Sequence, residues 1–249
     1  MTLGSLGWAN RTGGKLTTQE RLDMALSAAR MQITDWLART RPPHFTRVDV
    51  AALQLPDTAI VQDAFALCTA VSSPTLVNHC LRTYCWGVIF AQADDLRYDA
   101  ELLAVAGALH DLGLADAYKA KDPTAHCYAV EGGRVASGFV AERGWPPERC
   151  DRLNEMIALH LNVQVSVKQG AEAHLLNAGA ALDVIGLRHR EIAPETLTAV
   201  LERYPRLGFK AAIAAVLRDQ TQQRPQSRIA WLRTIAQLRS RIYSAPFPE

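Results

Sequence analysis

The segment VAGALHDLG, residues 105–113, decides the fold class of this chain. It is an Ala- and Leu-rich helical stretch that ends in His110 and Asp111, just before Gly113. A glycine directly after the last periodic residue is a common helix stop. Burying an imidazole and a carboxylate at the end of an apolar helix is costly unless both have partners. A divalent cation would offset both costs, so the segment predicts metal ligands at a helix end.

Three other segments carry a similar polar residue in apolar surroundings. They contain His79 in LVNHCLRTY, His160 in EMIALH and Asp183 in AGAALDVIG, each on or at the end of a predicted helix. Imidazole nitrogens and carboxylate oxygens suit zinc, iron, manganese or nickel, and such mixed sets leave room for water. We therefore expect His79, His110, Asp111 and Asp183 to hold one divalent transition metal ion, with zinc the first candidate.

The rest of the chain predicts an all-α fold. Thr17 and Glu20 have capping-box spacing, and apolar residues from Leu22 to Leu37 then repeat at helical intervals. Asp99 is a candidate cap for the helix that ends at His110. The run 163–167 is the only β-like segment, and we expect a loop there. The predicted helices cover about 18–39, 56–70, 75–93, 99–112, 126–143, 147–161, 171–187, 194–204, 207–221 and 226–242. Residues 1–15 read as a flexible tail, and 16–249 as a single domain.

Composition narrows the function classes. Of 249 residues, 49% are hydrophobic and 21% charged, and the net charge is +2. So small an excess gives no reason to expect a nucleic acid or membrane partner. Five cysteines without a C-x-x-C pair fit a reducing compartment. With no signal peptide and no apolar run long enough to span a bilayer, we expect a cytoplasmic protein that acts on a small molecule, and a homo-oligomer stays an open alternative to a monomer.

The four segments in order resemble the H…HD…D signature of the HD-domain metal hydrolases, over about residues 76–186. NHCLRTYCWG, GALHDLG, EGG and LDVIG are similar to the cyanamide-hydratase-like branch. The resemblance implies an HD-type helical bundle with helical extensions, the four ligands above, and His160 facing the same cavity. This chain has Tyr128-Ala129 where the family often has Phe-Glu, so the substrate of relatives cannot simply be transferred.

The expected mechanism is metal-assisted addition of water to a small polar molecule, either a nitrile-like carbon or a phosphoester. The ion would lower the pKa of a bound water from about 16 to about 7. Asp111 would orient or deprotonate that water, and His160 would relay a proton. The alternative for His160 is a cation at a helix C-terminus. Asn78 and Arg82 are candidate substrate-binding residues; Arg82 would pair with Asp111 or an anion, or lie on the surface.

Other polar residues read as structural. His126 is expected to start a helix, Lys119 and Lys121 to lie in a loop that could cover the cavity, and Cys80 and Cys85 not to act as nucleophiles. Three histidines, His44, His174 and His189, lack companions of a suitable type.

Three other functions remain open. A nucleotide phosphohydrolase would need cations, for which the chain offers Arg82, Arg97, Lys119, Lys121, Arg134 and Lys168. A di-iron oxygenase needs about six ligands, more than the sequence provides. A non-catalytic metal-stabilised binding module is the third.

Overall fold

The computed structural model describes residues 2–40, 45–119 and 127–249. Within them the chain forms twelve α-helices and no strand, only an isolated bridge between Thr46 and Ile192. The all-α prediction is therefore confirmed. The helices are α1 (Leu6–Thr12), α2 (Thr18–Arg39), α3 (Ala59–Val71), α4 (Pro74–Ala93), α5 (Ala100–Leu109), α6 (Tyr128–Ala141), α7 (Pro147–Leu159), α8 (Ala171–Ile185), α9 (Pro194–Arg203), α10 (Phe209–Gln223), α11 (Arg228–Ile235) and α12 (Leu238–Ser244).

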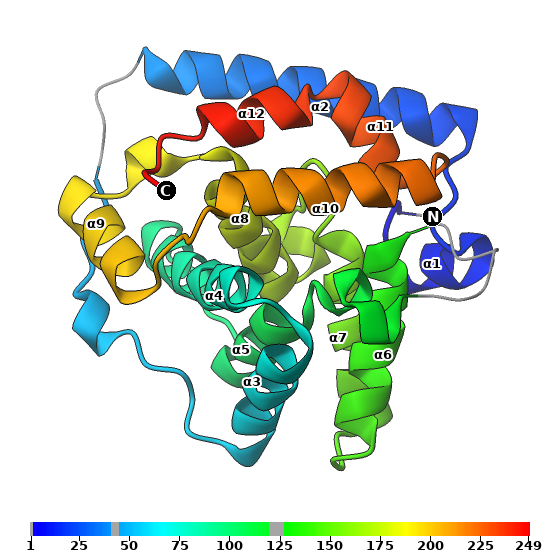
Figure 1. The fold of residues 1–249 in the computed structure, drawn as a ribbon, viewed down its shortest axis with the longest axis horizontal. Helices are drawn as coiled ribbons and strands as arrows, with labels where there is room; N and C mark the ends of the chain where they lie inside the picture. Colours follow the sequence, from blue (N-terminus) through cyan, green and yellow to red (C-terminus); the bar gives the residue numbers. More distant parts are fainter. Residues whose placement is uncertain (1, 41–44, 120–126) are drawn as a thin grey trace.

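The helices lie in two groups on either side of a central pair (Figure 1). The central pair is α4 and α8, which pack against each other, and α6 packs against α7 beside them. Helices α3 and α5 lie on one side of the pair, and α10, α11, α12 and α2 lie on the other. The candidate site sits where the central pair meets this second group.

A glycine allows α8 to approach α4 closely. A Cβ atom on Gly179 would lie 2.4 Å from the carbonyl oxygen of Thr83 and 3.1 Å from the nitrogen of Gly87, so a larger residue does not fit. Asp183 lies one turn after Gly179 on α8, and His79 lies one turn before Thr83 on α4. The close packing therefore brings these two buried side chains together.

A second close approach fixes the turn that follows α5. A Cβ atom on Gly113 would lie 2.0 Å from the carbonyl oxygen of Tyr128, and one on Gly132 would lie 2.9 Å from the nitrogen of Gly113. The segments GALHDLG and EGG are thus in backbone contact. This contact sets the position of Asp111, two residues before Gly113.

The start of the chain differs from the prediction. The expectation of a flexible tail over 1–15 is wrong, because Leu6–Thr12 forms α1, capped by the Ser5 side chain. Trp8 is fully buried, and its indole nitrogen donates to the Glu20 carboxylate at 2.7 Å. The guanidinium of Arg228 lies 5.0 Å from the centre of its ring. One large aromatic ring thus docks a segment whose composition resembles a linker.

Helix α2 has the predicted bounds and the predicted capping box, but it is apolar on two opposite faces. Met24, Ala28 and Met31 are buried against the protein. The apolar repeat that revealed the helix faces outward, with Leu22 53% and Ile33 58% exposed. Periodicity therefore located the helix but not its buried side.

The predicted last helix, 226–242, is two helices. The break falls at Gln237, which caps α12 with a left-handed φ of 48°. Asp99 caps α5 as predicted, its side chain accepting from the Leu102 nitrogen at 3.0 Å. Residues 163–167 form no strand.

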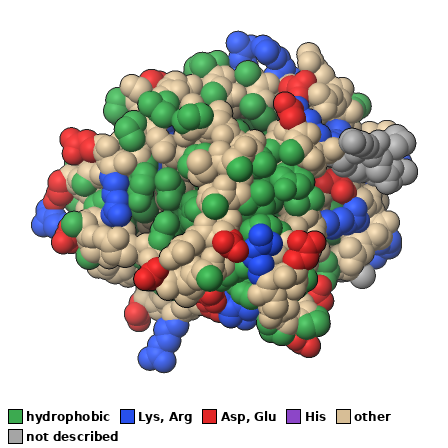
Figure 2. All heavy atoms as spheres, turned by 60° about the horizontal axis from the view of Figure 1, so that its bottom comes forward, with side chains coloured by type: hydrophobic (Ala, Val, Ile, Leu, Met, Phe, Trp, Pro, Cys, Tyr) green, Lys and Arg blue, Asp and Glu red, His purple; other side chains and the backbone are tan. Residues whose placement is uncertain are grey.

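None of the described helices combines the length and apolar character needed to cross a membrane. On the face drawn in Figure 2, positive and negative side chains are interspersed around an apolar centre. That face shows no broad field of one sign, in keeping with the small net charge.

Candidate metal centre

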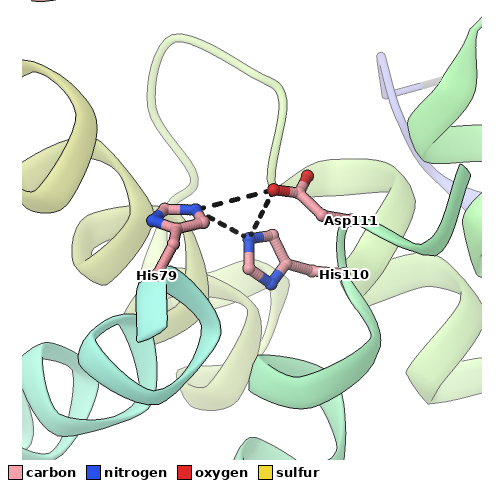
Figure 3. A group of neighbouring side chains, drawn as sticks. All are labelled: His79, His110 and Asp111. Atoms are coloured by element: carbon pink, nitrogen blue, oxygen red, sulfur yellow. Dashed lines mark hydrogen bonds and ion pairs between the residues drawn. The ribbon is translucent and has the colours of Figure 1, made fainter. Parts of the chain in front are cut away.

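Three buried side chains from two neighbouring helices meet at one point (Figure 3). His79 comes from the second turn of α4. His110 is the residue that ends α5, and Asp111 follows it in the turn held by Gly113. All three are at least nine-tenths buried. The structure thus brings together three of the four predicted ligands in a group that could bind a metal ion.

The spacing of the three ligand atoms fits a single cation. His79 Nε2 lies 3.3 Å from His110 Nε2. Asp111 Oδ2 lies 3.6 Å from His79 Nε2 and 3.4 Å from His110 Nε2. Nitrogen and oxygen ligands about 2.0–2.2 Å from a tetrahedral zinc ion stand about 3.3–3.5 Å apart. The triangle therefore has the size that such an ion requires.

Hydrogen bonds on the opposite side of each ring determine which nitrogen faces the centre. His110 Nδ1 donates to the Gly107 carbonyl oxygen at 2.9 Å, and His79 Nδ1 donates to the Asp183 carboxylate at 2.7 Å. Both Nε2 atoms are then left with lone pairs that point at each other across 3.3 Å. Such an approach is repulsive unless a proton or a cation lies between them.

The electrostatics favour a cation over a proton. Burial lowers the pKa of His110, which disfavours an imidazolium at this position. Burial by itself raises the pKa of Asp111, but the neighbouring His110 and His79 lower it by more than burial raises it. The pKa of that carboxyl therefore lies below its usual range. Both shifts are in the direction that favours the metal-binding form, an ionised carboxylate beside a neutral imidazole.

Asp183, predicted as a ligand, is not part of this group. Its Oδ2 accepts from His79 Nδ1, on the side of the ring away from His110 and Asp111. Burial raises the pKa of Asp183, but Arg82 and His79 lower it more, to well below its usual range. The carboxylate therefore orients His79 and keeps its Nδ1 protonated, a role that carboxylates often have behind metal-binding histidines.

Arg82 is neither a surface charge nor a partner of Asp111. Its side chain is fully buried, and it donates to both oxygens of Asp183, from Nε at 2.7 Å and from Nη2 at 2.9 Å. Asn78 donates to the Pro205 carbonyl oxygen at 2.8 Å. Neither residue is among those lining the cavity described below. Their predicted contact with substrate has no support in this geometry.

Three residues that the sequence reasoning missed complete the surroundings of Asp183 and His79. Trp86 Nε1 donates to Asp183 Oδ1 at 3.0 Å, and Arg206 Nη1 donates to the Asp183 carbonyl oxygen at 3.2 Å. The Phe209 ring stacks on His79 with 4.8 Å between ring centres. Trp86 lies one turn after Arg82 on α4 and could have been found from that spacing, whereas Arg206 and Phe209 are distant in sequence and gave no signal.

His160 ends α7 and faces the centre without joining the three-atom group. Its Nδ1 donates to the Ile157 carbonyl oxygen, and its Nε2 lies 3.9 Å from Asp111 Oδ1. Burial lowers the pKa of His160 to about 3, with His110 adding to the effect. The ring is buried, and its Nε2 is the nitrogen that faces the centre, so this position disfavours the alternative of a helix-terminal cation.

A cavity of about 120 Å³ opens onto the centre. His79, His110, Asp111, Tyr128 and His160 form its polar end. Asn162 and Asn177 also line it, and most of the remaining wall is aliphatic, from α8, α10, α11 and α12. Tyr128, noted in the sequence only as a departure from the family pattern, thus reaches the site.

Among the described residues, none of the cations considered for phosphate binding lines the cavity. Arg241 is the only Lys or Arg among the described residues that line the cavity. Lys119 pairs with Asp116 at 2.7 Å, and Arg134 pairs with Glu131 at 2.7 Å. Arg97 and Lys168 are exposed. Lys121 falls outside the described residues, as do His44 and His126.

The remaining histidines and cysteines have structural surroundings. His174 Nδ1 donates to the Val165 carbonyl oxygen and His189 Nδ1 to that of Gly186, both away from the centre. All five cysteines are free and buried. Burial raises the pKa of Cys85 to about 12, and a hydrogen bond with Cys68 raises that of Cys80, so neither thiol is prepared for nucleophilic attack.

Comparison of the chain with models of known protein families and with curated proteins gave no match. The assignment of a function therefore depends on the geometry of the centre and on the sequence signature that led to it.

Proposed function

We propose that this chain is a metal-dependent hydrolase or hydratase of the HD-domain type, which adds water to a small organic molecule. One observation carries the proposal: His79 Nε2, His110 Nε2 and Asp111 Oδ2 stand 3.3–3.6 Å apart with the opposite nitrogen of each histidine already hydrogen-bonded. Zinc is the first candidate because its preferred ligands and distances match this set, with iron, manganese and nickel as alternatives. Three protein ligands leave a position for water, as in catalytic zinc sites.

A divalent ion held there would supply Lewis-acid activation of water, bringing the pKa of that water to about 7. The protein's own groups would handle the proton. Asp111 Oδ1 points away from the three ligand atoms and lies 3.9 Å from His160 Nε2, a gap that one water can bridge. Because the Nδ1 of His160 donates to a carbonyl oxygen, Nε2 is the atom through which this ring would pass a proton from water to the substrate.

The cavity favours a neutral substrate over a phosphoester. Recognition of phosphate usually involves several cationic or backbone N–H donors, whereas Arg241 is the single Lys or Arg among the described lining residues. Addition of water across the triple bond of a nitrile gives an amide with no redox change and no anionic leaving group. A nitrile-like carbon is therefore the substrate we propose, and phosphoester hydrolysis is the alternative that this wall supports less.

The HD assignment is supported by two features. The His-Asp dipeptide ends a buried helix and meets a histidine from α4, and the EGG segment packs on the glycine that follows the dipeptide. The small residue Ala129 is fully buried in place of the family's usual Glu, so any role of that Glu is absent here.

Five free, buried cysteines are in keeping with a reducing compartment, and we propose the cytoplasm as the location of this protein.

Metal analysis tests the proposal. The protein, purified without chelator, should contain close to one divalent transition ion per chain by inductively coupled plasma mass spectrometry. His110→Ala should lose that ion. His189→Ala is the matched control, because His189 makes the same ring-to-carbonyl bond three residues back but lies outside the centre. Equal metal content in both variants would remove the basis of the proposal.

Activity assays then separate the reactions. Metal-loaded protein should convert small nitriles to amides, and His110→Ala should not. Phosphate release from a panel of nucleotides, without amide formation from nitriles, would contradict the proposed hydration and show that the protein is a phosphohydrolase. Inactivity with both panels, at full metal content, would favour a metal-stabilised binding module.

A further inference from the structure

The cavity at the metal centre is polar at one end and mainly apolar along the rest of its length. Its polar end is the group of His79, His110 and Asp111 together with Tyr128 and His160. Away from these residues the wall is made mainly by aliphatic side chains, among them Ala180 and Val184 of α8, Ile213 and Leu217 of α10, and Ile229 and Leu232 of α11. A site for a small, fully polar substrate would not need such a wall.

Helix α10 gives the direction and depth of this wall. Phe209, Ile213 and Leu217 are each one turn apart on the same face of the helix, and all three are buried. Phe209 stacks on His79, so the face begins at the metal centre. Four residues advance an α-helix by about 6 Å, so Ile213 and Leu217 lie about 6 and about 12 Å further along the helix axis. Both of these residues line the cavity.

Helix α8 supplies a second part of the wall. Ala180 and Val184 are one turn apart on α8, and both line the cavity. Ala180 and its neighbour Ala181 both line the cavity, and such small side chains leave volume that the protein does not fill itself. The resulting 120 Å³ is close to the size of an apolar cavity that holds benzene, about 150 Å³.

We propose that the substrate is amphipathic, with a small polar reacting group at the metal centre and an apolar body of about four to six carbons lying along α10. The inference rests on the proposed function, because it places the reacting group at the proposed metal. It goes beyond that function because it predicts that the protein prefers substrates with an apolar body over the smallest polar ones. The apolar body gains affinity by removing hydrocarbon surface from water, and each buried methylene tightens binding about threefold to fourfold.

Straight-chain hydroxamic acids test this inference, because their head group chelates divalent transition ions while the chain length varies. The dissociation constants of acetohydroxamic, butanohydroxamic, hexanohydroxamic and octanohydroxamic acid would be measured by calorimetry on the metal-loaded protein. We expect the constant to fall about threefold to fourfold per methylene until the chain fills the cavity. A constant that does not change with chain length would overturn the inference while leaving the metal centre intact. Failure of acetohydroxamic acid to bind would overturn the metal centre, and this inference with it.

Substitutions on α10 place the chain in the cavity. Leu217→Phe shortens the space at its far end, so octanohydroxamic acid should bind at least tenfold more weakly while acetohydroxamic acid binds as before. Ala215→Phe adds the same ring to the exposed face of α10 and should change neither constant. If Leu217→Phe does not fold, Leu217→Ala enlarges the same end and should extend the gain in affinity to longer chains. Octanohydroxamic acid binding that is unchanged in the folded Leu217 variant would show that the chain lies elsewhere and overturn the inference.

Discussion

Asp183 is the most constrained side chain of the centre. It is fully buried, and its carboxylate accepts hydrogen bonds from His79, Arg82 and Trp86. A buried carboxylate and guanidinium are stable only as a pair, because each compensates the loss of hydration of the other. The same carboxylate fixes the ring of His79. Asp183 therefore links the stability of the core to the geometry of the candidate metal ligands.

Asp183→Asn should lower both properties. We expect the free energy of unfolding of metal-free protein to fall by about 3–5 kcal/mol, because Arg82 is left as a buried charge without its counter-ion. Metal affinity should fall about 10- to 100-fold, since His79 loses the acceptor that orients it. Urea unfolding and competition with a metal-sensitive dye measure the two. Complete loss of metal at unchanged stability would instead make Asp183 a direct ligand.

His160 should matter for turnover and not for holding the ion. Its Nε2 is 3.9 Å from Asp111 Oδ1 and outside the three-atom group. If the protein catalyses the proposed nitrile hydration, His160→Ala should keep most of the metal but lower the turnover about 10²-fold or more, the usual contribution of a general acid–base group. Metal content and initial rates check this on the same sample. Loss of the ion in this variant would show that His160 is a ligand.

The identity of these residues was predictable from the sequence, but the role of one was not. His79, His110, Asp111 and His160 stand out as polar groups in apolar helical segments, and the structure places all four at one cavity. Asp183 stands out for the same reason. Spacing along the chain does not reveal which nitrogen of His79 a carboxylate approaches. That depends on the close packing of α4 and α8, which a glycine permits.

Helix α1 belongs to the folded core, although its sequence resembles a linker. It is only seven residues long and has no stability of its own. Trp8 fixes it by burying a whole indole ring between Glu20 and Arg228. We expect Trp8→Ala to lower the free energy of unfolding by about 3–5 kcal/mol.

Trp8→Phe separates packing from hydrogen bonding in the same position. It keeps most of the ring and loses the bond to Glu20, so its cost should be clearly smaller than that of Trp8→Ala. Chemical unfolding followed by far-ultraviolet circular dichroism compares the two variants. If Trp8→Ala were as stable as the wild type, residues 6–12 would contribute nothing to the folded core, and the prediction of a flexible tail would be right.

The end of α4 is joined to the segment after α8 by a group of charges. Asp94 accepts two hydrogen bonds from Arg188, at 2.7 and 2.9 Å, and lies 3.5 Å from His174 Nε2. Arg188 also donates to Glu191 at 2.9 Å. Burial raises the pKa of Asp94, but Arg188 and, to a smaller extent, His174 lower it by more than burial raises it. The pKa of this carboxyl therefore lies below its usual value.

This pKa shift predicts how the contribution of Asp94 to stability depends on pH. Because the pKa is lower in the folded protein, the contribution is fully present above the unfolded value of about 4 and is lost as the pH falls through the folded value. Asp94→Asn should therefore cost about 1 kcal/mol at pH 7 and much less near pH 3. Urea unfolding of both proteins at a series of pH values measures the difference. A cost that is the same at all pH values would rule out the ionic contribution.

Helix positions were largely predictable because capping residues and glycine stops lie close to the elements they bound. Thr17, Glu20 and Asp99 cap as expected. The errors have a tertiary origin. Which face of α2 is buried, and where the chain breaks at Gln237, depend on packing between distant segments, and no local pattern contains that information.

In the molecule as a whole, the candidate centre joins separate parts of the fold. His79 belongs to the central pair of helices, whereas His110 and Asp111 end a helix on one side of it. Phe209 brings α10 from the other side against His79. Only the folded chain can bind an ion with these side chains, because His79 and His110 are 31 residues apart in sequence and come together only on folding. Metal binding should therefore stabilise the whole protein and not only the cavity.

The magnitude follows from mass action. A ligand at about 100 times its dissociation constant stabilises the folded state by about 2.7 kcal/mol, which for a chain of this size corresponds to a rise in melting temperature of about 5–10 °C. Removing the ion with a chelator should lower the melting temperature by that amount, and adding zinc back should restore it. His110→Ala should melt at the same temperature with and without zinc, while His189→Ala should respond like the wild type. A wild-type protein whose melting temperature is insensitive to both chelator and added metal would show that the three ligand atoms, despite their spacing, do not hold an ion.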